Sequence, residues 1–279
     1  MYSEVAKHTA GASKNLWGLS SKFFWSFKWH YFVLMLSDYG RSAMVRKYDA
    51  VTTDRAYTPQ FSGLLGPLGT FVDRIIWNYP LHQALRERVQ NVSDILAELI
   101  EKNGKEIRIL SAPCGLIWDL ILTKEKLERQ GITLSRVHFY GLDLDFNGDV
   151  LPEARSRAEA NGLQIGLVRD NIFNIRRHYK MEFEVVNCIG LISWMELSEV
   201  EALVKYISRE ILTRDGYLVI DNFSRHEHSS IGDDLEIYTR YFDPAELKQL
   251  FERCGLKVIE ERTSSQGINT VYVLRRAKT

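Results

Sequence analysis

Glycine and acidic residues recur at the ends of three successive apolar segments in the second half of the chain. Gly115 follows the first segment, Asp143 ends the second, and Asp170 with Asn171 ends the third. A glycine turn lets backbone N–H groups approach a ligand closely, because no side chain blocks the approach. The Asp143 carboxylate can accept hydrogen bonds from both hydroxyls of a ribose. The acid and amide at 170 and 171 suit an exocyclic amine and a ring nitrogen. Each position taken alone is more often a turn, a cap or a solvated residue, and it is their order at three successive segment ends that favours a ligand site.

Two histidines, His226 and His228, flank Glu227 in the segment SRHEHSS. Histidine titrates near neutral pH, so it is the expected general base for a reaction at a hydroxyl group. No third ligand is evident in the sequence, so the segment does not predict a metal site. We take His226 and His228 as catalytic candidates. The alternative, loop histidines without a chemical role, stays open.

From Lys105 onward, apolar segments alternate with amphipathic helical segments, as is typical of a parallel sheet covered by helices on both faces. We therefore expect an α/β fold with a seven-stranded, mostly parallel sheet. No helix separates the last two strands, so one of them should run antiparallel. Because ligands of open α/β sheets bind at the carboxyl ends of the strands, Gly115, Asp143 and Asp170 should meet at one edge. The expected strands are 107–112, 137–144, 165–170, 183–192, 217–223, 256–262 and 269–276, and the expected helices are 116–130, 151–162, 195–212 and 243–255.

The order of these segments resembles the class I S-adenosylmethionine-dependent methyltransferases across residues 105–276. ILSAPCGLIWDL stands in the place of the glycine-rich first motif of that family, and GLDLDFNGDVLPEARSRAEANGL is similar to the second. LVRDNIFN, FEVVNCIGLISW and LTRDGYLVIDNF resemble the third, fourth and fifth. The resemblance implies that Asp143 holds the ribose of S-adenosylmethionine and that Asp170 faces the adenine amine. It implies a cofactor site made of Ser111, Ala112, Pro113, Cys114, Gly115, Asp143, Leu144, Asp170, Asn171, Ile172, Asn187 and Cys188.

The first motif departs from the family pattern. Only Gly115 of its glycines remains, with Pro113 and Ile117 at the flanking positions, and Ser111 stands where an acid often begins the motif. A dinucleotide-binding enzyme would need G-x-G-x-x-G, which the sequence lacks. We therefore expect methyl transfer to an oxygen, nitrogen or carbon atom of a small apolar or amphipathic molecule. A protein or RNA methyltransferase, or a non-catalytic protein that binds S-adenosylmethionine, stays open as an alternative.

The fourth and fifth strands bear on the subclass of methyltransferase. Enzymes that methylate the amino groups of bases resemble one another in an Asp/Asn-Pro-Pro-aromatic tetrad, and the sequence from Asn187 to Gly190 has no proline. Asp221 and Asn222 match a pair found in the metal-dependent catechol-type enzymes. Those enzymes also carry an acid where this chain has Asn187. We therefore expect no metal, with Asp221 a structural residue at the end of its strand.

Residues 1–103 differ in character from the remainder, which we take as the S-adenosylmethionine-binding domain, 104–279. They are rich in aromatic residues and helical patterns, and we expect them to form a cap or lid. The segment 55–69 contains two prolines and three glycines, so it should be irregular. Another helix should run from Pro80 into Ile100.

The aromatic segment 16–36 could be mistaken for a membrane span. Lys22 and Lys28 interrupt it, so its apolar stretches fall short of the ~20 residues that a span needs. We expect a helix with a wide apolar face. That face either packs on the rest of the protein, as a lid over the acceptor, or makes peripheral contact with a membrane.

The charge balance and the cysteines indicate which kinds of binding partner and which cellular compartment to expect. Lys+Arg and Asp+Glu both number 36, so no net charge favours nucleic acid as the main partner. The three cysteines lack CxxC spacing, which indicates reduced thiols. With no basic leader or cleavage site at the N-terminus, we expect a cytoplasmic protein with a small-molecule acceptor. The sequence does not indicate the oligomeric state.

Overall fold

The computed structural model describes residues 35–46, 49–58, 61, 66–226 and 239–277. The expectations for residues 16–34, and those for Glu227 and His228, lie outside the described residues. By their contacts the described residues divide into two units, one up to residue 86 and one from residue 87 onward. The division falls inside a long helix, α7 (Pro80–Asn103), whereas the boundary expected from the sequence lies at the end of that helix.

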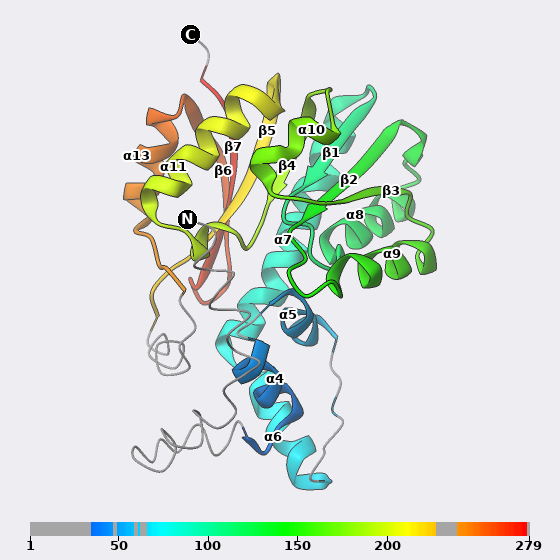
Figure 1. The fold of residues 1–279 in the computed structure, drawn as a ribbon, viewed down its shortest axis with the longest axis vertical. Helices are drawn as coiled ribbons and strands as arrows, with labels where there is room; N and C mark the ends of the chain where they lie inside the picture. The colour runs from blue at the N-terminus through cyan, green and yellow to red at the C-terminus, as the bar shows by residue number, and fades with distance from the viewer. Residues whose placement is uncertain (1–34, 47–48, 59–60, 62–65, 227–238, 278–279) are drawn as a thin grey trace. The chain divides into compact units, whose positions relative to one another are not determined.

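The first unit is helical, with α4 (Asp38–Arg46), α5 (Ala50–Tyr57), α6 (Pro67–Trp77) and the start of α7 (Figure 1). The helix expected from Pro80 is confirmed. The expectation of an irregular segment over 55–69 was wrong at both ends, because α5 continues to Tyr57 and α6 already begins at Pro67. Pro67 occupies the first turn of α6, where its missing N–H has no helical partner to lose and its fixed φ suits the helix.

The second unit contains one seven-stranded sheet with the order β3-β2-β1-β4-β5-β7-β6. β7 pairs antiparallel with both β5 and β6, and the other paired strands are parallel, as expected. The chain reverses its direction of strand addition between β1 and β4, which are neighbours in the sheet. The strands are β1 (Ile107–Ser111), β2 (Val137–Asp143), β3 (Ile165–Arg169), β4 (Phe183–Cys188), β5 (Leu212–Phe223), β6 (Leu256–Thr263) and β7 (Asn269–Arg276).

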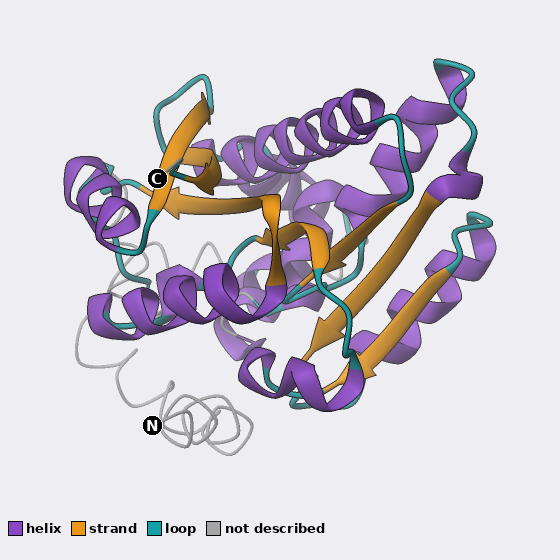
Figure 2. Ribbon diagram, turned by 90° about the horizontal axis from the view of Figure 1, so that it is seen from above, coloured by secondary structure: helices purple, strands orange, loops and turns teal. Residues whose placement is uncertain are grey.

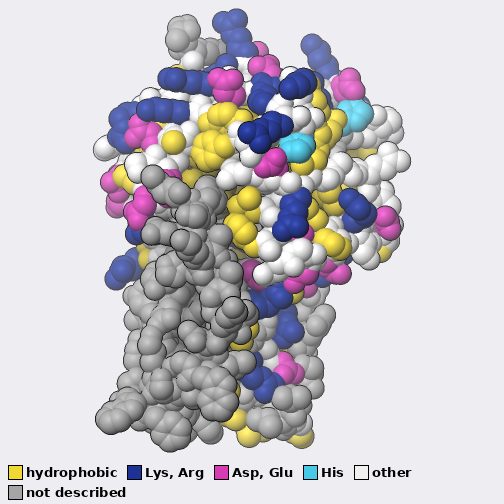
Figure 3. Space-filling view, in the orientation of Figure 1, with side chains coloured by type: hydrophobic (Ala, Val, Ile, Leu, Met, Phe, Trp, Pro, Cys, Tyr) yellow, Lys and Arg dark blue, Asp and Glu magenta, His cyan; other side chains and the backbone are white. Residues whose placement is uncertain are grey.

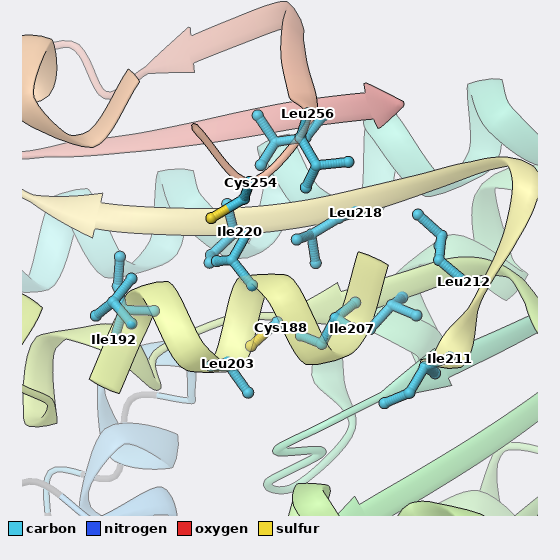
Figure 4. Packing of buried hydrophobic residues seen from close by; sticks show 14 of the residues in the cluster. Cys188, Ile192, Leu203, Ile207, Ile211, Leu212, Leu218, Ile220, Cys254 and Leu256 are labelled. Carbon is cyan, nitrogen blue, oxygen red and sulfur yellow. The ribbon is translucent and has the colours of Figure 1, made fainter. Parts of the chain in front are cut away.

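Helices cover both faces of this sheet, as Figure 2 shows. Because successive side chains of a strand point to opposite faces, Leu110 belongs to one apolar cluster and Ile109 to the other. α8 (Trp118–Arg129), α9 (Val150–Ala160) and the later part of α7 contribute to the cluster around Ile109. α10 (Ile175–His178), α11 (Leu197–Tyr206) and α13 (Pro244–Arg253) contribute to the cluster around Leu110, part of which is drawn in Figure 4. The parallel, doubly covered sheet predicted from the apolar runs is confirmed.

Two element boundaries differ from those expected. The strand expected over 183–192 ends at Cys188, because Gly190 has φ 74° and a 3-10 turn follows at Ile192–Trp194. The helix expected over 195–212 is α11 followed by a π-helical turn at Ile207–Ile211. β5 then begins at Leu212, five residues before the expected start.

None of the helices in the described part of the chain is long and apolar enough to cross a bilayer.

Candidate functional site

The turn after β1 is anchored to both neighbouring strands. The Ala112 N–H donates to the Asn187 carbonyl in β4 at 2.8 Å, and the Cys114 N–H donates to the Leu142 carbonyl in β2 at 2.9 Å. Gly115 then adopts φ 48°, a left-handed conformation that costs glycine nothing. The turn is therefore held at the carboxyl ends of the central strands, where the sequence placed it.

Asp143 joins this turn to the one after β2. Its Oδ2 accepts from the Gly115 N–H at 3.0 Å, and its Oδ1 accepts from the Asp145 N–H at 2.9 Å. Burial raises the pKa of the Asp143 carboxyl, and the backbone donors oppose that rise. Each oxygen keeps further lone pairs, so the carboxylate can still accept ligand hydroxyls. Leu144, the next residue, is half-buried.

Gly141 permits the close approach of β2 to the turn. A Cβ on Gly141 would lie 2.6 Å from Leu167 Cδ2 and 3.1 Å from both Cβ and Sγ of Cys114. Burial raises the pKa of the Cys114 thiol well above its ordinary value. The Cys114 side chain is therefore an uncharged thiol that packs under the turn.

Asp145 has a role that sequence reasoning missed. Its side chain is buried and accepts from the Val150 N–H at 2.9 Å and the Leu151 N–H at 3.2 Å. These are donors of the first turn of α9, which an acidic side chain stabilises. Asp145 also has φ 40°, which asparagine and aspartate tolerate better than most residues. The acid two positions earlier, Asp143, is the one that faces the β1 turn.

Asp170 lies beside Asp143 and is densely hydrogen-bonded. Its N–H donates to the Asp143 carbonyl at 3.1 Å. Its Oδ1 accepts from Asn174 Nδ2 at 2.8 Å and from the Asn171 N–H at 2.7 Å, and its Oδ2 lies 2.7 Å from His178 Nε2. The Asn174 amide, followed by His178, lowers the pKa of the Asp170 carboxyl to about 2. The residue is therefore a carboxylate throughout the neutral range.

The two residues after Asp170 begin a short 3-10 turn, Ile172–Asn174. Asn171 caps this turn, because its Oδ1 accepts from the Phe173 N–H at 3.0 Å. Ile172 is buried in the apolar cluster that also contains Ala112 and Cys188. Because the side chains of Ile172, Ala112 and Cys188 are buried in this cluster, any contact of these residues with a ligand would be made mainly by their backbone atoms.

Asn187 lies one residue before the end of β4, beside Ser111, its register partner in β1. Asn187 Nδ2 donates to Ser111 Oγ at 3.1 Å and to the Asp119 carboxylate of α8. The side-chain amide oxygen of Asn187, Oδ1, is buried and has no hydrogen-bond partner among the described residues. Burial raises the pKa of the Asp119 carboxyl. Sequence reasoning missed Asp119, which lies well away from Asn187 along the chain.

Asp221, two residues before the end of β5, accepts hydrogen bonds from three donors. Its Oδ2 accepts from Arg88 Nη1 at 3.1 Å and from Asn269 Nδ2 at 2.9 Å, and its Oδ1 accepts from the Gly190 N–H at 2.6 Å. Asn222 next to it binds the backbone of Phe242. Across the described residues, no group of three or more His, Cys, Asp and Glu side chains has the arrangement of a metal site.

His226 is half-buried, and its ring lies edge-on to that of Tyr241, with ring centroids 6.2 Å apart at an interplanar angle of 89°. Phe242, directly after Tyr241, is buried. The other candidate, His228, lies outside the described residues. The assignment of both histidines as catalytic therefore stays a prediction.

No protein-family model and no curated protein matches the chain. Solved structures do match. A possible exported protein from Bordetella parapertussis is 19% identical over 88% of this chain and 86% of its own, with a TM-score of 0.69. A magnesium protoporphyrin IX methyltransferase from Synechocystis PCC 6803 with bound S-adenosylhomocysteine is 13% identical, with coverage of 81% and 99% and a TM-score of 0.53. A mitomycin 7-O-methyltransferase is 14% identical, with coverage of 84% and 62% and a TM-score of 0.52.

Two of these structures are methyltransferases, and the present sheet has seven strands with β7 antiparallel at the position between β5 and β6. The chain has the class I methyltransferase fold. On this fold, Gly115, Asp143 and Asp170 lie together at the carboxyl ends of β1, β2 and β3, linked by hydrogen bonds. The expected fold is thereby confirmed. The roles expected for the individual site residues remain predictions.

Proposed function

We propose that this protein binds S-adenosylmethionine and transfers its methyl group to a small molecule. The observation that carries the proposal is the bond from the Gly115 N–H to Asp143 at 3.0 Å, because it brings a glycine turn and a strand-end carboxylate together within the class I methyltransferase fold. Such an arrangement offers backbone donors and a hydroxyl acceptor to one nucleoside ligand.

The residues present fit this cofactor. Asp143 would hold the ribose, Asp170 and Asn171 the adenine, and the turn from Ser111 to Gly115 the remainder. Asn187 Oδ1, which is buried and has no hydrogen-bond partner among the described residues, gives an independent sign of fit, because native proteins seldom leave such an acceptor unpaired unless a ligand or water completes it. When bound, the cofactor supplies an electrophilic methyl group on a sulfonium.

The chain's own contribution to transfer is positioning and, for a hydroxyl acceptor, removal of a proton. His226 beside Tyr241, and His228 after it, are the proposed bases. We propose residues 1–103 as a cap, in which the aromatic segment 16–36 would wall the acceptor and exclude water.

Two observations favour a small molecule over a protein or RNA acceptor. Two of the similar structures, at TM-scores of 0.53 and 0.52, are methyltransferases of magnesium protoporphyrin IX and of mitomycin. In addition, Lys and Arg side chains are interspersed with Asp and Glu on the face of the described residues drawn in Figure 3. A groove for a nucleic acid backbone would instead present clustered positive charge.

Calorimetry with S-adenosylmethionine and S-adenosylhomocysteine tests the first half of the proposal. We expect both to bind at one site. Incubation with cofactor labelled in the methyl group, against a panel of apolar and amphipathic small molecules, then tests transfer. If neither S-adenosylmethionine nor S-adenosylhomocysteine binds, the proposal is refuted. Binding without label transfer to small molecules, proteins or RNA would support the non-catalytic alternative instead.

A further inference from the structure

α6 carries a row of large apolar side chains on its outer side, in the first helical unit (Figure 1). Leu68, Phe71 and Ile75 are 54%, 61% and 52% exposed. Their spacing of three and four residues places them next to one another on a single side of the helix. Single exposed apolar side chains are ordinary on a protein surface, whereas a contiguous row marks a surface that meets a partner or a lipid.

The opposite side of α6 fixes which way the helix faces. Val72 and Ile76 are buried there, and α6 packs against α4. Asp73, the single acid of α6, is 1% exposed and accepts a hydrogen bond from the buried Ser37 hydroxyl. A rotation of the helix that hid Phe71 would break this bond. The helix therefore holds its acid inside and apolar side chains outside, the reverse of the usual arrangement at a water-facing surface.

Positive charge dominates the same part of the sequence. Residues 1–86 contain ten Lys and Arg against five Asp and Glu, a net charge of +5, and because the whole chain is balanced, residues 87–279 carry −5. Arg74 is exposed next to Ile75. Two of the described acids in this stretch are buried and two form ion pairs with arginines; they are Asp54 and Asp73, and Asp38 and Asp49. Such a charge asymmetry favours an anionic partner.

We propose that the outer side of α6 docks on a membrane surface that contains anionic lipids. Leu68, Phe71 and Ile75 enter the boundary between headgroups and acyl chains, and Arg74 meets the lipid phosphates. With 11 residues α6 is about 16 Å long, so it lies in this boundary and does not cross the hydrocarbon core. A second copy of the chain would bring the same positive charge to this face, so anionic lipid complements it better. The inference does not depend on the proposed function.

Flotation of the full-length protein with lipid vesicles tests the proposal. We expect the protein to float with vesicles of equal parts phosphatidylcholine and phosphatidylglycerol, and to bind vesicles of phosphatidylcholine alone much more weakly. Replacing both Phe71 and Ile75 with Gln should lower partitioning onto the anionic vesicles about 10- to 100-fold, because roughly half of each apolar side chain is free to enter the bilayer. Failure of the wild-type protein to float with the anionic vesicles overturns the proposal.

Ile259 in β6 offers a matched control, because it is 51% exposed, nearly as much as Ile75, and lies in the second unit. Ile259→Gln should bind the anionic vesicles as wild type does, whereas Ile75→Gln should bind them more weakly. Arg74→Gln should weaken binding about fivefold, the usual effect of one cation near an anionic surface. Equal losses in Ile75→Gln and Ile259→Gln would show adsorption without a defined face and overturn the proposal.

A fluorescent label makes the test independent of how well the glutamine variants fold. The three cysteines of the chain are buried, so Ile75→Cys can be labelled with an environment-sensitive dye. Its emission should shift to the blue with the anionic vesicles, and the same dye on Ile259→Cys should not shift. No shift at residue 75 overturns the proposal.

Two further results would assign the outer side of α6 to another occupant. Light scattering without lipid measures the mass of the protein in solution. A dimer that becomes a monomer when Phe71 and Ile75 are replaced with Gln would assign this face to a second copy. Undiminished flotation of that folded variant would assign the lipid contact to another part of the chain, such as segment 16–36. Either result overturns the proposal, and a monomer whose flotation needs both side chains supports it.

Discussion

The Asp143 carboxylate accepts the Gly115 N–H at 3.0 Å and so ties the turn after β1 to the turn after β2. Its other oxygen accepts from Asp145, whose side chain in turn caps the first turn of α9. One carboxylate therefore fixes the positions of two backbone segments that the proposed cofactor would contact. Loss of this side chain would remove both the proposed ligand contact and the link between the two turns.

Asp143→Ala should weaken binding of S-adenosylhomocysteine by about 1–3 kcal/mol, the range for hydrogen bonds to a charged group. Calorimetry measures this change, and circular dichroism checks that the fold is intact. Asp215→Ala is the matched control, because Asp215 is largely exposed and pairs only with Arg275 among the contacts described. Unchanged affinity in a folded Asp143→Ala protein would contradict the assignment of Asp143 to the ribose.

Gly141→Ala should lower the free energy of unfolding by about 1–2 kcal/mol, the lower part of the range for overpacking in a core. The new Cβ would lie 2.6 Å from Leu167 Cδ2, which can rotate away, and 3.1 Å from the Cys114 Cβ, which belongs to the turn and cannot. Urea unfolding measures the change. Gly166→Ala in β3 is the control, because its nearest contacts are at 3.4 Å and it should change stability by less than about 0.5 kcal/mol. Equal stability of the two variants would show that the turn has more room than the structure indicates.

The fold could be predicted from the sequence because strands that are buried on both faces consist of short runs of apolar residues. β1 is such a run, since its neighbouring residues Ile109 and Leu110 belong to opposite apolar clusters. The ends of strands were harder to predict where the backbone conformation of a single residue sets them. Gly190 ends β4 through its positive φ, while the apolar residues after it continued the pattern of a strand.

The site followed from the sequence only in part, because its side-chain partners are distant along the chain. The residues at strand ends could be named, since parallel strands bring their carboxyl ends to one edge. The contacts of Asp119 with Asn187 and of Arg88 with Asp221 span 68 and 133 residues, and no spacing rule joins such pairs. Asp145 could have been distinguished from Asp143 by a local signal, because an acid shortly before a helix is a common cap.

Turnover should be unaffected by chelators. The Asp221 carboxylate already accepts from Arg88, Asn269 and Gly190, and Asn187 stands where the catechol-type enzymes have an acid. A cation there would have to displace the Arg88 guanidinium and take a neutral amide as a ligand. Methyl transfer assayed with and without EDTA measures this. Loss of activity with EDTA and recovery with Mg²⁺ would establish Asp221 and Asn222 as metal ligands.

His226→Gln should lower kcat by about 10²–10⁴-fold for a hydroxyl acceptor, the usual contribution of a general base. Glutamine keeps the size and polarity of the side chain and cannot take up the proton, so the affinity for S-adenosylhomocysteine should stay the same. The pH profile of kcat should also lose the limb that reports the base. Tyr241→Phe is the control, because it keeps the edge-on ring beside His226 without its hydroxyl. A kcat reduced less than about tenfold in His226→Gln would exclude His226 as the base, and the same measurement on His228→Gln then examines the second candidate.

His82, in the first helical unit, should make stability depend on pH. It is buried beside the rings of Tyr39 and Tyr79, and its Nδ1 contacts the Ile76 carbonyl. Burial lowers the pKa of His82 from 6.5 to about 4, with Arg86 adding a smaller effect in the same direction. The folded protein therefore holds His82 neutral in a range where the unfolded chain is protonated.

Between pH 6.5 and about 4 the unfolded state binds one more proton than the folded state, so stability should fall as the pH falls through this window. The full effect of His82 amounts to about 3 kcal/mol, since each pKa unit corresponds to about 1.4 kcal/mol. Above pH 7 its contribution should be constant. His82→Gln can still donate to the Ile76 carbonyl but does not titrate, so the difference between wild type and variant isolates the histidine. Urea unfolding of both proteins from pH 7.5 to 4.5 measures it. Parallel stability curves across that range would show that His82 is solvated and protonates normally in the folded protein.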